Sequence, residues 1–151
     1  HSFPTRRSSD LNFFVSGAYV ASDLWDNRLV KANEEDKKFA MEVLKYKWRV
    51  GQAARNGKVK SVASPFPEIT GSYTYYQDLN PESYVVESPD ALEPAAQGAF
   101  TILRYSENNL SAGIAYKGNY KTCVLGFPFE AIRTVTEREL LMKAILTFFE
   151  H

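Results

Sequence analysis

Three apolar segments near the end of the chain restrict its fold more than any other feature of the sequence. Residues 100–105, 112–116 and 120–126 each have the length and the aromatic and branched side chains of a β-strand. They are separated by Glu107–Asn109 and by Lys117–Asn119, whose asparagine and glycine residues favour tight turns. The sequence therefore predicts a run of adjacent strands in the second half of the chain.

An earlier strand and two helices are predicted around this run. Residues 12–15 form a short apolar strand that ends in a turn at Ser16–Gly17. The acidic residues 34–36 mark the first turn of an amphipathic helix, where the helix dipole favours negative charge. Thr136 and Glu139 have the spacing of a capping box at the start of a terminal helix.

The order of the elements indicates the fold class. Short strands are expected at 58–63, 71–76 and 84–87, followed by a proline-containing loop over 88–98. The order strand, helices, mixed β region and terminal helix predicts a three-layer α/β domain. A doubly wound sheet needs more parallel strands than these, so we expect the domain to be N-terminally truncated, with further strands upstream of Asn12.

The beginning of the chain does not read as protein sequence. His1–Leu11 resembles one reading frame of a widely used short-read library adapter without a break. We therefore interpret residues 1–11 as an adapter-derived artefact and exclude them from reasoning about the fold. Residues 12–151 are then expected to be the C-terminal part of one α/β domain.

Charge and composition exclude several classes of protein. Lysine plus arginine and aspartate plus glutamate number 18 each, without the clustered basic face that nucleic-acid binding requires. No apolar run is long enough to cross a membrane. The single cysteine, Cys123, cannot form an internal disulfide, and its apolar strand predicts an inert buried thiol. We predict neither a cofactor nor a bound metal.

Several phrases of the sequence resemble one bacterial family. They are Val15–Tyr19, Tyr84–Ala91, Arg104–Ser106, Val124–Glu130 and Phe148–Phe149. In order and spacing, over Asn12 to Glu150, they resemble the C-terminal domain of xanthan lyase-like or golvesin-like secreted proteins. The resemblance implies a parent that is secreted, periplasmic or attached to the cell surface. It also implies polysaccharide or cell-wall glycan, and the upstream domains of the same chain, as partners.

The turn at Ser16–Gly17 and the segment Gly126–Pro128 also resemble the class I glutamine-amidotransferase-like fold, which is a flavodoxin-like sandwich. Enzymes of that group place a cysteine at the strand-to-helix elbow, with a histidine and a glutamate late in the chain. Here Ala18–Tyr19 occupies the elbow, and the only histidines are His1 and His151. The resemblance therefore implies the fold and argues against the chemistry.

Ser16 is the one residue at the elbow that could act as a nucleophile. A serine nucleophile needs a base within hydrogen-bond reach, and no internal histidine is present. The alternative is that Ser16 closes the turn and caps the following helix. A catalytic site built from Ser16, Asp23 and Glu130, completed by residues upstream, would make the domain a hydrolase or lyase.

Carboxylates and tyrosines supply the candidate ligand-binding residues. Glu87 and Asp90 lie on a loop of the kind where α/β folds bind ligands. With Glu93 and Glu130 they could carry out glycoside chemistry or hold calcium, and the alternative is a solvated turn.

Two tyrosines form the second group of candidate ligand-binding residues. Tyr73 and Tyr75 share one face of a predicted strand, where an exposed pair would suit a sugar ring or a protein interface. Ordinary strand packing is the alternative.

These features favour a non-catalytic accessory domain of a secreted protein that acts on polysaccharide or cell wall. Such a domain stabilises its parent or binds glycan or a partner. The hydrolase or lyase described above is the alternative from a different class. A third possibility is an oligomerisation module, which would show a large exposed apolar patch.

Overall fold

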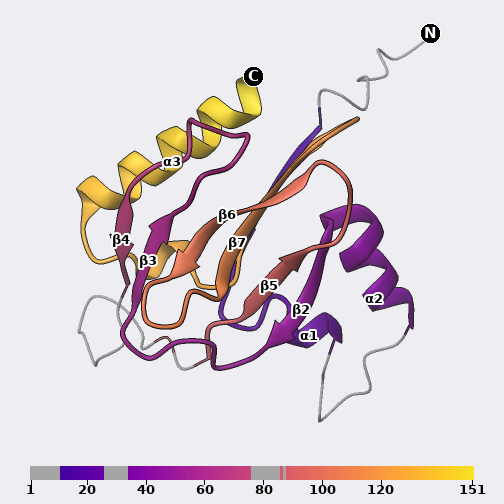
Figure 1. Cartoon of the computed structure of the whole chain (residues 1–151), viewed down its shortest axis with the longest axis horizontal. Helices are drawn as coiled ribbons and strands as arrows, with labels where there is room; N and C mark the ends of the chain where they lie inside the picture. Colours follow the sequence, from indigo (N-terminus) through magenta and orange to yellow (C-terminus); the bar gives the residue numbers. More distant parts are fainter. Residues whose placement is uncertain (1–10, 26–33, 76–85, 87) are drawn as a thin grey trace, which may run out of the picture.

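A curled sheet of six strands forms the centre of the molecule (Figure 1). The computed structural model describes residues 11–25, 34–75, 86 and 88–151. In spatial order the strands are β1 (Asn12–Ser16), β8 (Lys121–Leu125), β7 (Ser111–Lys117), β6 (Ala99–Tyr105), β3 (Lys58–Ser61) and β4 (Ser72–Thr74). Only the β1–β8 pair is parallel, and the other four pairs are antiparallel.

The remaining elements flank this sheet. A two-stranded antiparallel sheet joins β2 (Tyr46–Val50) to β5 (Ala91–Pro94). The helical elements are α1 (Ser22–Trp25), α2 (Glu34–Phe39) with the π-helical turn η2 (Ala40–Leu44), the 3₁₀ turn η3 (Phe129–Ala131) and α3 (Val135–Glu150). In Figure 1, α3 lies on one side of the large sheet, whereas α1, α2 and the small sheet lie on the other.

Strand β8 shows how the sheet is buried on both faces. Cys123 and Leu125 belong to the hydrophobic cluster that contains the inner face of α3. Val124, between them, belongs to a second cluster with Leu44 and Tyr46. Successive side chains of a strand point to opposite faces, so the apolar run Cys123–Leu125 is the expected sequence for this position. The prediction of a central strand here is confirmed.

The prediction of a three-layer flavodoxin-like or amidotransferase-like sandwich is wrong. The structure is mainly β, with a mixed half-barrel sheet and a two-stranded sheet in place of helices on much of one face. The physical reason lies in the connections, because β6, β7 and β8 follow one another through tight turns. A parallel pair needs a crossover of about a dozen residues or more, so these strands can only pair antiparallel.

The local predictions vary in accuracy. Strands at 12–15, 100–105, 112–116 and 120–126 are confirmed. The expected loop over 88–98 instead contains β5, and the predicted strand at 84–87 lies mostly outside the described residues. Antiparallel pairing with β2 turns part of this proline-containing segment into a strand.

The N-cap of the terminal helix lies two residues earlier than predicted. Thr134 is the N-cap residue, and its Oγ1 accepts a hydrogen bond of 3.1 Å from the Glu137 N–H. The same hydroxyl lies 3.0 Å from Glu137 Oε2, so the capping interaction uses Thr134 and Glu137 rather than Thr136 and Glu139. The inner face of α3 consists of Leu141, Ile145 and Phe148, which are buried.

Candidate functional site

Ser16, the candidate nucleophile, ends β1 and holds the chain segment before α3. Its Oγ accepts a hydrogen bond of 3.2 Å from the Phe129 N–H. This contact brings Ser16 beside η3, where the exposed Glu130 is the next residue. The structure therefore places two predicted catalytic residues in neighbouring segments that are far apart in the sequence.

The non-catalytic role expected for Ser16 was to cap the helix that follows β1. In the structure Asp90 caps this helix instead. Its Oδ2 accepts hydrogen bonds of 2.9 Å from the N–H groups of Ala21 and Ser22, at the start of α1. Its own N–H donates to the carbonyl of Gly126, and the Tyr105 hydroxyl donates to its carbonyl, both at 2.7 Å. Asp90 is completely buried. The side chain and backbone of one residue thus join β5, α1, β6 and the end of β8.

A small polar cluster surrounds the Asp90 carboxylate. Burial raises the pKa of Asp90 from its ordinary value of 3.8 to about 6, against the lowering effect of the Ser22 and Ala21 amides. The side-chain dipoles of Trp48 and Ser22 also favour the charged form. Their polar atoms, Trp48 Nε1 and Ser22 Oγ, nevertheless lie outside hydrogen-bond geometry, as does Asp90 Oδ1. A carboxyl group with a raised pKa among buried polar atoms is a feature that functional sites share with structural networks.

The other candidate carboxylates do not join Asp90 in one cleft. Glu93 lies further along β5, partly exposed, and forms an ion pair of 2.9 Å with Arg49. Asp23 is a residue of α1, but its side chain and the whole of Glu87 lie outside the described residues. Among the residues that the structure describes, no group of three histidine, cysteine, aspartate or glutamate side chains could hold a metal ion.

Tyr73 in β4 and Tyr75, which directly follows that strand, both pack into one hydrophobic cluster instead of forming an exposed pair. The side chain of Tyr73 is 3% exposed and that of Tyr75 is fully buried. Tyr75 stacks on Phe127 with 5.1 Å between ring centroids. The Tyr73 hydroxyl donates a 2.6 Å hydrogen bond to the carbonyl of Thr70. Neither tyrosine offers an open ring face to a ligand, although the edge of Tyr73 reaches a groove.

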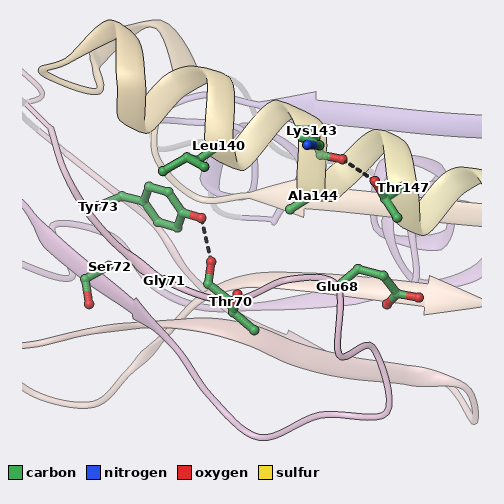
Figure 2. Close-up of a pocket in the computed structure, with 9 residues that line it drawn as sticks. All are labelled: Glu68, Thr70, Gly71, Ser72, Tyr73, Leu140, Lys143, Ala144 and Thr147. Atoms are coloured by element: carbon green, nitrogen blue, oxygen red, sulfur yellow. Dashed lines mark hydrogen bonds between the residues drawn. The ribbon is translucent and has the colours of Figure 1, made fainter.

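That groove runs between the segment before β4 and the outer part of α3 (Figure 2). It encloses about 430 Å³, within the range of about 300–1,000 Å³ that is usual for ligand pockets. The residues that give it its chemical character are Glu68, Thr70, Tyr73, Leu140, Lys143 and Thr147. In the view of Figure 2, Tyr73 and Leu140 lie toward one end, and Glu68 and Thr147 lie toward the other.

The groove contains one acidic and one basic side chain, Glu68 and Lys143. Glu68 Oε2 is covered by protein atoms and accepts no hydrogen bond. Within the described part of the chain, neither Glu68 nor Lys143 forms an ion pair. Glu68 does act at longer range on Lys121: burial and the charge of Lys117 lower the pKa of Lys121, and the charge of Glu68 partly offsets this.

Of the groove residues, only Tyr73 is a candidate from the sequence. Leu140, Lys143 and Thr147 recur at spacings of three and four residues, which marks one face of a helix beside the buried face. Leu140 is 56% exposed, so this face carries an apolar side chain that the core does not use. This second, partly apolar stripe on α3 is the sequence feature that could have predicted the groove. Glu68 had none, because a glutamate in a proline-containing loop is ordinary.

The chain matches no family model, no curated protein and no solved structure. None of the helices in the described residues is both long enough and apolar enough to span a membrane.

Proposed function

We propose that this domain is a non-catalytic accessory module of a secreted or surface-attached bacterial protein that handles polysaccharide or cell-wall glycan. It stabilises its parent and contributes to the binding of glycan. The class of parent follows from the sequence resemblance. The observation that carries the non-catalytic part is the use of Ser16 as a hydrogen-bond acceptor for the Phe129 N–H.

A serine nucleophile must give its proton to a base that is held within hydrogen-bond reach. The hydrogen bond of Ser16 Oγ with the backbone instead joins β1 to η3. Asp90, the most strongly perturbed carboxyl, likewise caps backbone N–H groups from inside the protein. Burial raises the pKa of Cys123 to about 12, which keeps this thiol protonated and unreactive at neutral pH. Ser16 and Asp90 are thus engaged in hydrogen bonds with the backbone, and Cys123 is an inert buried thiol.

The test uses the full chain and a panel of purified bacterial capsular and cell-wall polysaccharides, xanthan among them. Affinity gel electrophoresis measures retention, and assays for new reducing ends and for unsaturated products measure cleavage. The accessory function predicts retention by at least one polysaccharide without cleavage of any. Cleavage that disappears in Ser16→Ala would overturn it, and so would the absence of retention by every polysaccharide.

A hydrolase or lyase is the second candidate, and one contact favours it. The hydrogen bond from the Phe129 N–H places Ser16 beside the segment that carries Glu130. This candidate predicts that Ser16→Ala and Glu130→Gln each lower cleavage about a hundredfold or more, as the loss of a nucleophile or a general acid does. Equal retention of polysaccharide by both variants, with no cleavage by the unaltered chain, would rule it out.

A further inference from the structure

The groove between the segment before β4 and α3 has walls that the fold holds firmly. Gly71 has a φ of 117°, a left-handed conformation that favours glycine. A Cβ at this position would lie 3.0 Å from the Tyr73 hydroxyl, so the absence of a side chain lets Tyr73 pack against the backbone. The hydrogen bond from Tyr73 to Thr70 then fixes the phenol ring. The opposite wall is a regular helix, so the groove exists before any ligand arrives (Figure 2).

Glu68 has a feature that the fold does not explain. Covering a carboxylate oxygen without giving it a donor is unfavourable, and native structures contain few such groups. Glu68 lines the groove, so a change of side-chain rotamer, rather than an exchange of its two equivalent oxygens, would bring Oε2 to a ligand. A ligand that donates hydrogen bonds to Glu68 would remove this unfavourable contribution, which indicates a ligand with hydroxyl or N–H groups.

The remaining groups restrict the ligand further. Glu68 and Lys143 bring one negative and one positive charge to the groove, so its charges balance and favour ions of neither sign. Thr147 Oγ1 donates to the carbonyl of Lys143, at 2.7 Å, and keeps its lone pairs for a ligand hydroxyl. Leu140 adds an exposed apolar surface. Neutral molecules with many hydroxyl groups and apolar ring faces fit this combination.

We propose that this groove binds a neutral saccharide. Glu68 accepts hydrogen bonds from adjacent sugar hydroxyls, Lys143 donates to a ring or hydroxyl oxygen, and Leu140 packs on the apolar face of the ring. This inference rests on the proposed glycan-binding function and assigns that function to one site.

The experiment titrates ¹⁵N-labelled full chain with five neutral disaccharides: cellobiose, maltose, lactose, gentiobiose and N,N′-diacetylchitobiose. Amide shift changes at Gly71, Ser72 and the stretch 140–147 of α3 are the expected result for at least one of them. Glu68→Gln keeps the shape and removes the charge, and Lys143→Met removes the donor. We expect each to weaken binding about tenfold, the effect of losing a charge-assisted hydrogen bond.

Matched controls carry the same chemical changes on the other side of the sheet. Glu35→Gln lies on α2 and Lys47→Met on β2, and both residues are exposed. Both controls should bind as the unaltered chain does, and thermal unfolding verifies that all four variants are folded. Binding that is unchanged in Glu68→Gln and Lys143→Met would overturn the groove assignment and leave the proposed function standing. No shift with any disaccharide would overturn the groove assignment, and the polysaccharide panel would then test the function by itself.

Discussion

Two carboxylates beside the large sheet are used in opposite ways. Asp90 is completely buried, and its Oδ2 accepts two backbone N–H groups. Glu68 is partly covered and lies on the same side of the large sheet as α3. Its buried Oε2 accepts no hydrogen bond from the described residues. The first carboxylate joins segments of backbone that are distant in sequence, whereas Oε2 of the second has no hydrogen-bond donor in the part of the chain that the structure describes.

The difference separates a role in folding from a role in binding. A buried carboxylate needs hydrogen bonds, and those of Asp90 to the Ala21 and Ser22 N–H groups offset part of its loss of hydration. An acid without such bonds at the wall of a groove remains available to a ligand. Perturbation of the pKa alone would have selected Asp90 as the functional residue, and its hydrogen bonds indicate a structural one instead.

Gly126→Ala is expected to have the largest effect on stability, because it disrupts the close contact between Gly126 and Asp90. The Gly126 carbonyl accepts the Asp90 N–H at 2.7 Å, and a Cβ at position 126 would overlap the Asp90 carbonyl oxygen. Since backbone cannot move aside cheaply, we expect a loss of more than about 4 kcal/mol or no cooperative unfolding. Gly17→Ala is the control, since its Cβ would meet Val20 at an ordinary 3.7 Å. Similar urea midpoints for both variants would contradict close packing of Gly126 against Asp90.

The second prediction concerns pH and the Asp90 charge. The pKa of Asp90 is about 6 in the folded protein and ordinarily 3.8, so between these values the folded form binds the proton more tightly. Its contribution to stability is therefore complete below about pH 3.8 and is lost as the pH rises through 6. The loss amounts to about 3 kcal/mol.

Urea unfolding at intervals from pH 3.5 to 8 measures this effect. Asp90→Asn should remove about 3 kcal/mol from the difference in unfolding free energy between the two ends of the range. Other carboxyl groups titrate in both proteins and cancel in the comparison. A pH profile that is the same for both proteins would show that Asp90 is not the group responsible.

Much of the fold could be predicted from the sequence, but its class could not. The segments 100–105, 112–116 and 120–126 are confirmed as strands because short-range turn chemistry and apolar patterning both mark them. Their antiparallel order was implicit in the same turns. The three-layer sandwich came from the overall order of elements and from a resemblance, and neither reports strand direction. Strand β5 was missed because its pairing with β2 is between residues distant in sequence.

The candidate site residues, like the fold, could be predicted only in part from the sequence. Asp90 could be identified as a notable residue, but its partners Ala21 and Ser22 are almost seventy residues away, with separations of 69 and 68. Tyr73 and Tyr75 were expected to lie together and both belong to one hydrophobic cluster, while their burial depends on Phe127 and on the loop before β4. Glu68 shows the limit most clearly, since a missing hydrogen-bond partner is a property of the three-dimensional structure alone.

Gly71→Ala, at the wall of the groove, should have an intermediate effect on the unfolding free energy. An alanine would have to adopt the φ of 117°, and its Cβ would press on the Tyr73 hydroxyl at 3.0 Å. We expect a loss of about 1–3 kcal/mol, because the strained backbone conformation adds to a contact that a side-chain end can partly relieve. Ser72→Ala, at the exposed neighbouring residue, is the control and should change stability by less than about 0.5 kcal/mol. Disaccharide titration of both variants then shows whether the wall formed by Tyr73 shapes the site.

Glu68→Gln completes the comparison with the smallest expected effect on stability. Among the described residues Glu68 forms no ion pair and its Oε2 accepts no hydrogen bond, so its long-range attraction for Lys121 is the interaction that disappears. Removal of a partly covered charge works in the opposite direction, so the unfolding free energy should change by less than about 0.5 kcal/mol. Urea unfolding at pH 7 measures it beside the unaltered chain. A loss above about 1 kcal/mol would mean that Glu68, like Asp90, has interactions that the fold needs, and the contrast between the two carboxylates would disappear.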